Sequence, residues 1–135
     1  MTDNGTGIGK EYLPLAFARH ATSKIETEED LDRIGTLGFR GEALASISTV
    51  SKLLMITKTR EEKTGGRIEM HGGEVISNQE TGCPDGTTVI ISELFYNVPA
   101  RKRFLKRDST ESTLIIDFIS KISLAYPNIR FRMIN

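Results

Sequence analysis

The hydrophobic pattern of the chain changes period once, and this change restricts the fold more than any other feature of the sequence. Apolar and polar residues alternate over much of residues 53 to 92, which is typical of strands with one buried face. Four strands are expected, over residues 53–59, 67–71, 74–77 and 87–92. Gly72-Gly73 separates the middle two strands as in a two-residue hairpin, so at least this pair is expected to be antiparallel.

Apolar residues at positions i, i+3, i+4 and i+7 mark three stretches outside this region as helices, over residues 13–21, 43–50 and 108–125. Pro14 lacks a backbone N–H, so the first helix is expected to begin just before it. Asp108 and Glu111 have the spacing of a capping box, and alternation over 129–133 predicts a last strand. The pattern predicts an α+β fold: a two-layer sandwich with helices over a mixed, antiparallel-rich sheet.

Length and charge limit the classes of function. The 135 residues suit one domain, and 18 basic against 18 acidic side chains exclude a uniformly basic nucleic-acid-binding surface. A single cysteine, Cys83, cannot build a disulfide framework and indicates a reducing compartment. No apolar run approaches the ~18 residues that a membrane span needs. Residues 22–40 carry few apolar side chains, and a connection of this length is typical of a functional lid.

Three glycine-bearing segments carry the chemistry, at residues 3–8, 38–44 and 85–88. Taken singly, each is more typical of a turn or of close packing. Together they indicate a nucleotide site, because a carboxylate followed by glycines, such as Asp3, can accept a hydrogen bond from an exocyclic amine, and a glycine-flanked helix start attracts phosphates. Thr87 offers a small hydroxyl donor to a base edge or a water. No Gly-Lys-Ser/Thr occurs, so the site is neither a P-loop nor a Rossmann fingerprint.

The order of these motifs resembles the MutL family of DNA mismatch repair proteins over essentially the whole chain. The resemblance depends on Asp-x-Gly-x-Gly at 3–7, His-Ala-Thr-Ser-Lys-Ile at 20–25, Gly-Phe-Arg-Gly-Glu-Ala-Leu at 38–44 and Gly-Thr-Thr at 86–88. Tyr-Asn-Val-Pro-Ala-Arg at 96–101 favours a bacterial form. The family belongs to the GHKL ATPase superfamily, with the DNA gyrase B subunit, the ninety-kilodalton heat-shock chaperones and the histidine kinases. The resemblance implies a Bergerat-type ATP-binding fold.

The resemblance also implies a role for each matched position. Asp3 would bind the adenine amine, Gly5 and Gly7 would shape the pocket wall, and Thr87 would be a second polar anchor. The lid over 22–40 would bring three residues over the nucleotide: Thr22, Ser23 and Lys24. Main-chain donors around the phosphates would come from Arg40, Gly41, Glu42, Ala43 and Leu44.

In this superfamily a glutamate on an upstream helix is the general base, and an asparagine one turn later holds Mg²⁺. That helix would precede Met1, so residues 1–135 are interpreted as an incomplete GHKL ATPase domain with no catalytic residue and no metal ligand of its own. The parent protein is expected to be an ATPase with ATP and Mg²⁺ as cofactors. This fragment alone is expected to be inactive.

For the parent, the resemblance implies a cytoplasmic, nucleoid-associated DNA repair switch. ATP would drive it, coupling mismatch recognition by MutS to downstream strand processing, with self-dimerisation. The alternative is a non-hydrolysing nucleotide-binding or dimerisation module of the same superfamily. A run of basic residues is a candidate for DNA phosphate contacts, or else a solvated helix face: Arg101, Lys102, Arg103, Lys106 and Arg107.

The remaining reactive side chains are not expected to do chemistry. His20 closes an apolar stripe and is expected to be a packed or lid histidine, and His71 is expected to face solvent. Cys83 has no acid–base partner nearby in the sequence, so a nucleophilic role is not expected. No cysteine and histidine cluster has zinc-ligand spacing.

Overall fold

The computed structural model describes residues 1–18 and 41–135, which form two compact units, Met1–Val98 and Pro99–Asn135. The expected lid over 22–40 lies outside the described residues. So do the following individual predictions: His20, Thr22, Ser23, Lys24 and Arg40.

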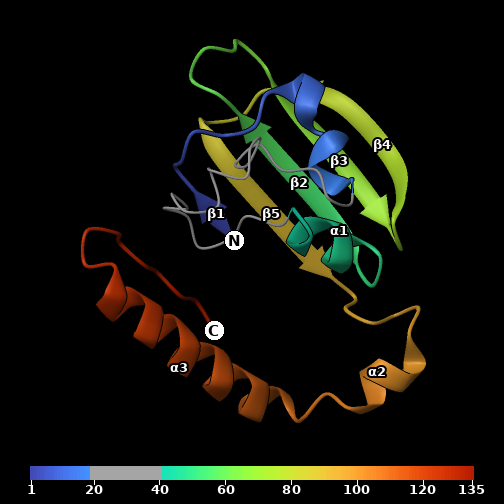
Figure 1. Ribbon diagram of the computed structural model, residues 1–135, viewed down its shortest axis with the longest axis vertical. Coiled ribbons are helices and arrows are strands. Elements are labelled where there is room, and N and C mark those ends of the chain that lie inside the picture. The colour runs from blue at the N-terminus through green and yellow to red at the C-terminus, as the bar shows by residue number, and fades with distance from the viewer. Residues whose placement is uncertain (19–40) are drawn as a thin grey trace, which may run out of the picture. The chain divides into compact units, whose positions relative to one another are not determined.

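The first unit is built on a five-stranded sheet in the order β1-β5-β2-β3-β4, in which every pairing is antiparallel (Figure 1). The strands are β1 Thr2–Asp3, β2 Lys52–Lys58, β3 Gly65–His71, β4 Glu74–Thr81 and β5 Gly86–Ser92. All four expected strands are present. β1 was not expected as a strand. It forms because Met1 and Val89 exchange main-chain hydrogen bonds, which brings Asp3 opposite Thr87.

The hairpin between β3 and β4 follows the prediction. Gly72 and Gly73 both have positive φ, +61° and +92°, as the tight turns that match the twist of paired strands require. The alternation is also real: every second residue of β2, from Leu53 to Thr57, is buried.

The core of this unit lies between one face of the sheet and the helical segments drawn over it in Figure 1. Its members are Leu13, Leu53, Met55, Ile68, Met70 and Val89. Helix α1, Ala43–Ser48, covers part of this face as expected, and Leu44 and Ile47 pack against the core from it. Burial of these alternating apolar side chains is the main source of stability for such a sheet.

The single helix expected over 13–21 is wrong within its described part. The chain forms two 3₁₀ turns instead, η1 Lys10–Tyr12 and η2 Leu15–Phe17, and Ala18 is already extended with ψ at 138°. Pro14 separates the turns because it has no N–H to continue an α-helical ladder. The apolar spacing still predicted a buried residue correctly, since the Leu13 side chain is fully buried.

The second unit contains α2, Pro99–Arg103, and α3, Asp108–Ala125. The expected capping box is wrong in detail: the N-cap is Arg107, with no side-chain cap, although the Glu111 carboxylate accepts the Lys106 N–H at 2.9 Å. The strand expected over 129–133 is also wrong. No strand forms there in the described structure, because alternation alone supplies no partner strand for main-chain pairing. None of the described helices has the length and apolar character to span a membrane.

Candidate functional site

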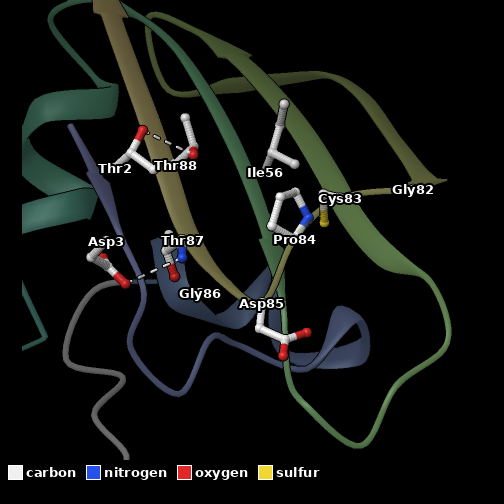
Figure 2. A pocket seen from close by; sticks show the side chains of 10 residues that line it. All are labelled: Thr2, Asp3, Ile56, Gly82, Cys83, Pro84, Asp85, Gly86, Thr87 and Thr88. Carbon is white, nitrogen blue, oxygen red and sulfur yellow. Dashed lines mark hydrogen bonds between the residues drawn. The ribbon is translucent and has the colours of Figure 1, made fainter.

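Asp3 is held in place by main-chain donors. It ends β1, directly opposite Thr87 at the start of β5. Its Oδ1 accepts the Gly5 N–H at 2.9 Å and the Thr87 N–H at 3.2 Å, the second of which is drawn in Figure 2. Within the described residues Oδ2 makes no hydrogen bond. The carboxylate is exposed, so it presents one fixed, available acceptor beside the strand.

Thr57 connects the glycine-rich turn after β1 with the first residues of β5. Its side chain is fully buried in β2, and its Oγ1 accepts the Ile8 N–H at 2.9 Å. It donates to the main-chain carbonyl of Gly86 at 3.0 Å and lies 3.0 Å from the hydroxyl of Thr87. One buried hydroxyl therefore joins the glycine-rich turn after β1 to the start of β5.

Thr57 was not among the residues expected in the site from the sequence. The signal that could have found it is a polar residue at an inward position of β2, two residues after buried Met55. A buried hydroxyl needs partners, and inward polar residues therefore mark places where main-chain segments meet.

The direction of the Thr57–Thr87 hydrogen bond follows from the number of hydrogens. A threonine hydroxyl has one hydrogen, and that of Thr57 is directed to the Gly86 carbonyl. The hydrogen between the two hydroxyls therefore belongs to Thr87. From the sequence, Thr87 was expected to be a donor toward a ligand. Because its hydrogen is directed to Thr57, its remaining capacity toward a ligand is as an acceptor.

Two glycines permit the close approach of the segments. Gly86 has φ of +104°, and a Cβ there would overlap the main-chain carbonyl of Asp3. Gly7 has φ of +72°, and a Cβ there would overlap the main-chain carbonyl of Lys58. Both positions combine a left-handed conformation with direct backbone contact, so side chains are excluded for two reasons. The Asp-x-Gly-x-Gly and Gly-Thr motifs are thus packed against one another and against β2.

Glu62 and Glu80 hold the far end of the glycine-rich turn. Glu62 accepts the Lys10 N–H at 3.1 Å and the Thr59 hydroxyl at 2.8 Å, and these bonds, that of Lys10 first, hold the pKa of Glu62 below its usual value. The Lys10 ammonium pairs with Glu80 at 2.7 Å, which lowers the pKa of Glu80 and raises that of Lys10. The turn is therefore anchored at Ile8 and again at Lys10.

A pocket of about 270 Å³ adjoins Asp3 (Figure 2). Its lining is Thr2, Asp3, Ile56, Gly82, Cys83, Pro84, Asp85, Gly86, Thr87 and Thr88. Ile56 and Thr88 alternate with buried Thr57 and Val89, so this hollow opens on the face of the sheet opposite the core. Cys83 is half-buried in its wall, and Asp85 is paired with Lys58 at 2.7 Å.

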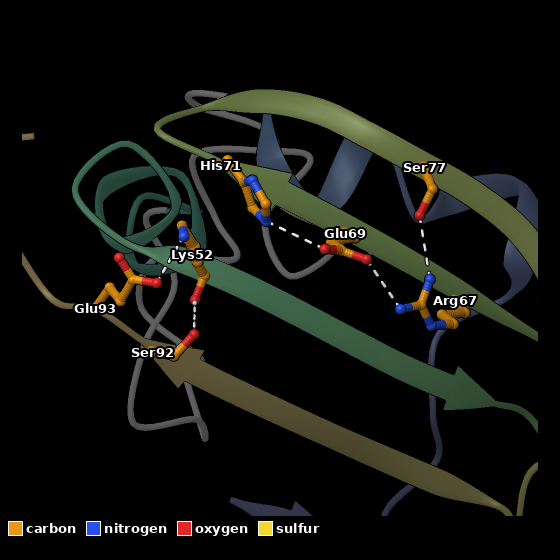
Figure 3. A network of polar contacts seen from close by, with 7 residues as sticks. All are labelled: Lys52, Arg67, Glu69, His71, Ser77, Ser92 and Glu93. Atoms are coloured by element: carbon orange, nitrogen blue, oxygen red, sulfur yellow. Dashed lines mark hydrogen bonds and ion pairs between the residues drawn. The ribbon is translucent and has the colours of Figure 1, made fainter. Parts of the chain in front are cut away.

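A network of polar side chains centred on Glu69 lies on the same outer face of the sheet and has a structural role (Figure 3). Glu69 accepts from Arg67 at 2.9 Å and contacts the His71 ring at 3.1 Å, and the Arg67 bond chiefly holds the pKa of Glu69 below its usual value. Arg67 also donates to Ser77 at 3.1 Å. The His71 side chain is 31% exposed and hydrogen-bonded, so the expectation that it simply faces solvent needs correction.

The structure thus brings together Asp3, Gly5, Gly7 and Thr87 among the residues expected in the site. Gly41, with φ of +64°, precedes α1, and Glu42, Ala43 and Leu44 form the start of that helix. That these four meet the phosphates of a nucleotide held at Asp3 stays a prediction. The five residues of the basic run are exposed in the second unit, on α2 and just after it. Within the described residues no three metal-binding side chains cluster.

The described architecture is the α+β fold of GHKL-type ATPase domains. It matches the "Aquifex aeolicus MutL ATPase domain complexed with ADP" with a TM-score of 0.69 and 32% sequence identity, over 95% of this chain and 43% of that one. Within this class, the chain is homologous over its whole length to the bacterial DNA mismatch repair protein MutL.

The sequence comparison supports that assignment. Identity to MutL is 52% over 135 residues in Agathobacter rectalis and 50% over 133 residues in Pelotomaculum thermopropionicum. These matches cover 100% and 98% of the chain, and 21% and 22% of the relatives. The chain thus spans about a fifth of the length of the curated relatives it matches. No family model matches it.

Proposed function

We propose that the chain forms the adenine-binding part of an ATPase domain, with Asp3 as the acceptor for the amino group of the base. The observation that carries the proposal is the carboxylate of Asp3: two main-chain N–H groups fix Oδ1, while Oδ2 has no partner among the described residues. A fixed acceptor loses little freedom on binding, which favours affinity. Gly5 and Gly7 form the adjoining wall, and Thr87 is the second polar group beside the base.

The phosphates would be bound at the other end of the site. The resemblance assigns this to the main chain of Arg40, Gly41, Glu42, Ala43 and Leu44, with Thr22, Ser23 and Lys24 in a lid. Gly41 has positive φ immediately before α1, which is compatible with a backbone turned toward an anion. The solved MutL ATPase domain of Aquifex aeolicus complexed with ADP supports a nucleotide ligand for this fold.

Hydrolysis of ATP is proposed for the complete protein. The resemblance assigns the general base and the Mg²⁺ ligand of this superfamily to a glutamate and an asparagine on one helix of the complete domain, and the proposal for hydrolysis rests on that resemblance. When bound, Mg²⁺ would supply charge neutralisation at the phosphates. The residues of this chain would bind and orient the base. A non-hydrolysing nucleotide-binding or dimerisation module is the outcome if that helix lacks a glutamate and an asparagine one turn later.

In the cell, the complete protein would act in DNA mismatch repair as a nucleotide-driven switch. Nucleotide binding would favour self-dimerisation and pass a signal from MutS to strand processing in the cytoplasm, near the nucleoid. The exposed basic run from Arg101 to Arg107 would contact DNA phosphates without reading bases. The support for these roles is the homology to MutL.

Calorimetric titration of ADP into the complete natural protein tests the site. Asp3→Asn is expected to weaken binding roughly 10- to 100-fold, because hydrogen bonds to charged groups contribute about 1.5–3 kcal/mol. Asp85→Asn is the matched control: this acid lines the adjoining pocket but is paired with Lys58, so affinity should be retained. Equal affinities for the wild type and Asp3→Asn would refute the proposed site.

A further inference from the structure

We propose that Thr57 is a positioning residue that makes the site selective for a purine with an amino group at C6, acting through the hydroxyl of Thr87. The inference rests on the proposed adenine nucleotide site. Thr57 itself is fully buried in β2, so it acts on a ligand only through its hydrogen-bond partners. Those partners are the Ile8 N–H, the Gly86 carbonyl and the Thr87 hydroxyl.

Two of these partners are main-chain groups, which cannot exchange roles. The Ile8 N–H can only donate to Thr57, at 2.9 Å, and the Gly86 carbonyl can only accept from it, at 3.0 Å. The single hydrogen of Thr57 is therefore committed, and one lone pair is left for Thr87 at 3.0 Å. The backbone thus decides which of the two hydroxyls donates.

Thr87 would have to break this bond to donate to a ligand. Rotation of its hydroxyl would leave a lone pair of a fully buried oxygen unsatisfied, which is costly in a site that water does not reach. Among the described residues every buried side-chain polar atom has a partner, and Thr57 has the Thr87 hydroxyl as one of its three. Thr87 therefore faces a ligand as an acceptor.

Two acceptors then lie side by side at the junction of β1 and β5: the Asp3 carboxylate and the Thr87 hydroxyl (Figure 2). An amino group at C6 of a purine satisfies acceptors, whereas a carbonyl oxygen at the same position places a third acceptor against them. The geometry therefore favours adenine over hypoxanthine, and Thr57 maintains this preference without touching the base.

The test compares the affinities of ADP and inosine diphosphate for the complete natural protein. The wild type is expected to prefer ADP. In Thr57→Val the Thr87 hydroxyl is released and can donate to the C6 carbonyl, so the preference should fall roughly three- to tenfold, the factor that corresponds to one net hydrogen bond. Thr57→Ser keeps the hydroxyl and should keep the wild-type ratio, which separates the polar role from loss of packing.

The double variant shows whether Thr57 acts through Thr87. In a Thr87→Val background, Thr57→Val should leave the ratio of affinities unchanged, and a change of equal size there overturns the inference. If Thr57→Val does not fold, Thr87→Val alone decides, since an unaltered ratio in that variant contradicts a role for the hydroxyl. ADP binding with an unaltered ratio in Thr57→Val overturns only this inference. A wild type that binds neither nucleotide overturns the proposed function as well.

Discussion

Asp3 and Thr87, 84 residues apart in the sequence, lie directly opposite each other across β1 and β5, and the Thr87 N–H donates to the Asp3 carboxylate at 3.2 Å. The sheet itself therefore places the acid beside the hydroxyl. Perturbation of this pairing should affect stability and nucleotide binding together, because the proposed site uses the contacts that pair the two strands.

Gly86→Ala should destabilise the first unit. The new Cβ would overlap the Asp3 carbonyl, and φ at this position is +104°, so we expect a loss of about 1–3 kcal/mol in the free energy of unfolding. Denaturant unfolding measures it. Gly82→Ala is the matched control, because nothing lies within 4 Å of a Cβ there. Equal stabilities of the two variants would contradict the packing of β1 on β5.

Leu13→Ala should cost about 2–5 kcal/mol of stability, the range for truncation of a fully buried leucine. Leu15→Ala, two residues away and at a side chain that is 55% exposed, should cost far less. The difference between their unfolding midpoints measures how strongly the buried Leu13 side chain anchors the two 3₁₀ turns, and equal losses would contradict this role.

Acid should weaken the anchoring of the glycine-rich turn. The pKa values of Glu62 and Glu80, which hold this turn, are lowered in the folded state, as is the pKa of Glu69 in the separate network on the outer face. Their stabilisation is therefore fully present above the unfolded value near 4.5 and is lost as the pH falls through the folded values. Glu62→Gln should lower stability at neutral pH and flatten its decline in acid, as thermal melts at several pH values would measure. Exposed Glu61 is the control, since Glu61→Gln should retain the wild-type profile.

Charge reversal of Arg103 and Lys106 should flatten the salt dependence of DNA binding by the complete protein. Each lost phosphate contact removes roughly one unit from the slope of log affinity against log salt. Arg60→Glu, at an exposed position in the first unit, should leave the slope as it is. A slope that is the same in all three proteins would argue for the alternative, a solvated helix face.

The 135-residue chain alone should show no Mg²⁺-dependent phosphate release above background. The reason is that, by the resemblance, the general base and the metal ligand belong to a helix that is not matched by any of residues 1–135, and hydrolysis depends on both. A steady-state release assay measures this, and clear turnover by the isolated chain would show that the base lies within it.

The strands could be predicted from sequence wherever one face is buried. β2 and β5 were found almost to the residue because their alternation reflects burial. β4 runs four residues beyond its prediction, since it is an edge strand exposed along most of its length and its end carries no hydrophobic signal. Alternation over 129–133 failed for the converse reason: a strand also needs a partner, which local pattern does not report.

The sequence by itself determined the four main strands, helix α1, the antiparallel hairpin and the motifs that indicate a nucleotide site. These depend on local periodicity and on glycines whose backbone requirements are local. Tertiary structure alone decided that Thr57 joins those motifs and that Thr87 is left as an acceptor. The partners of Thr57, Ile8 and Gly86, lie 49 and 29 residues away from it along the chain. Only the strand register brings the buried Thr57 hydroxyl within reach of both.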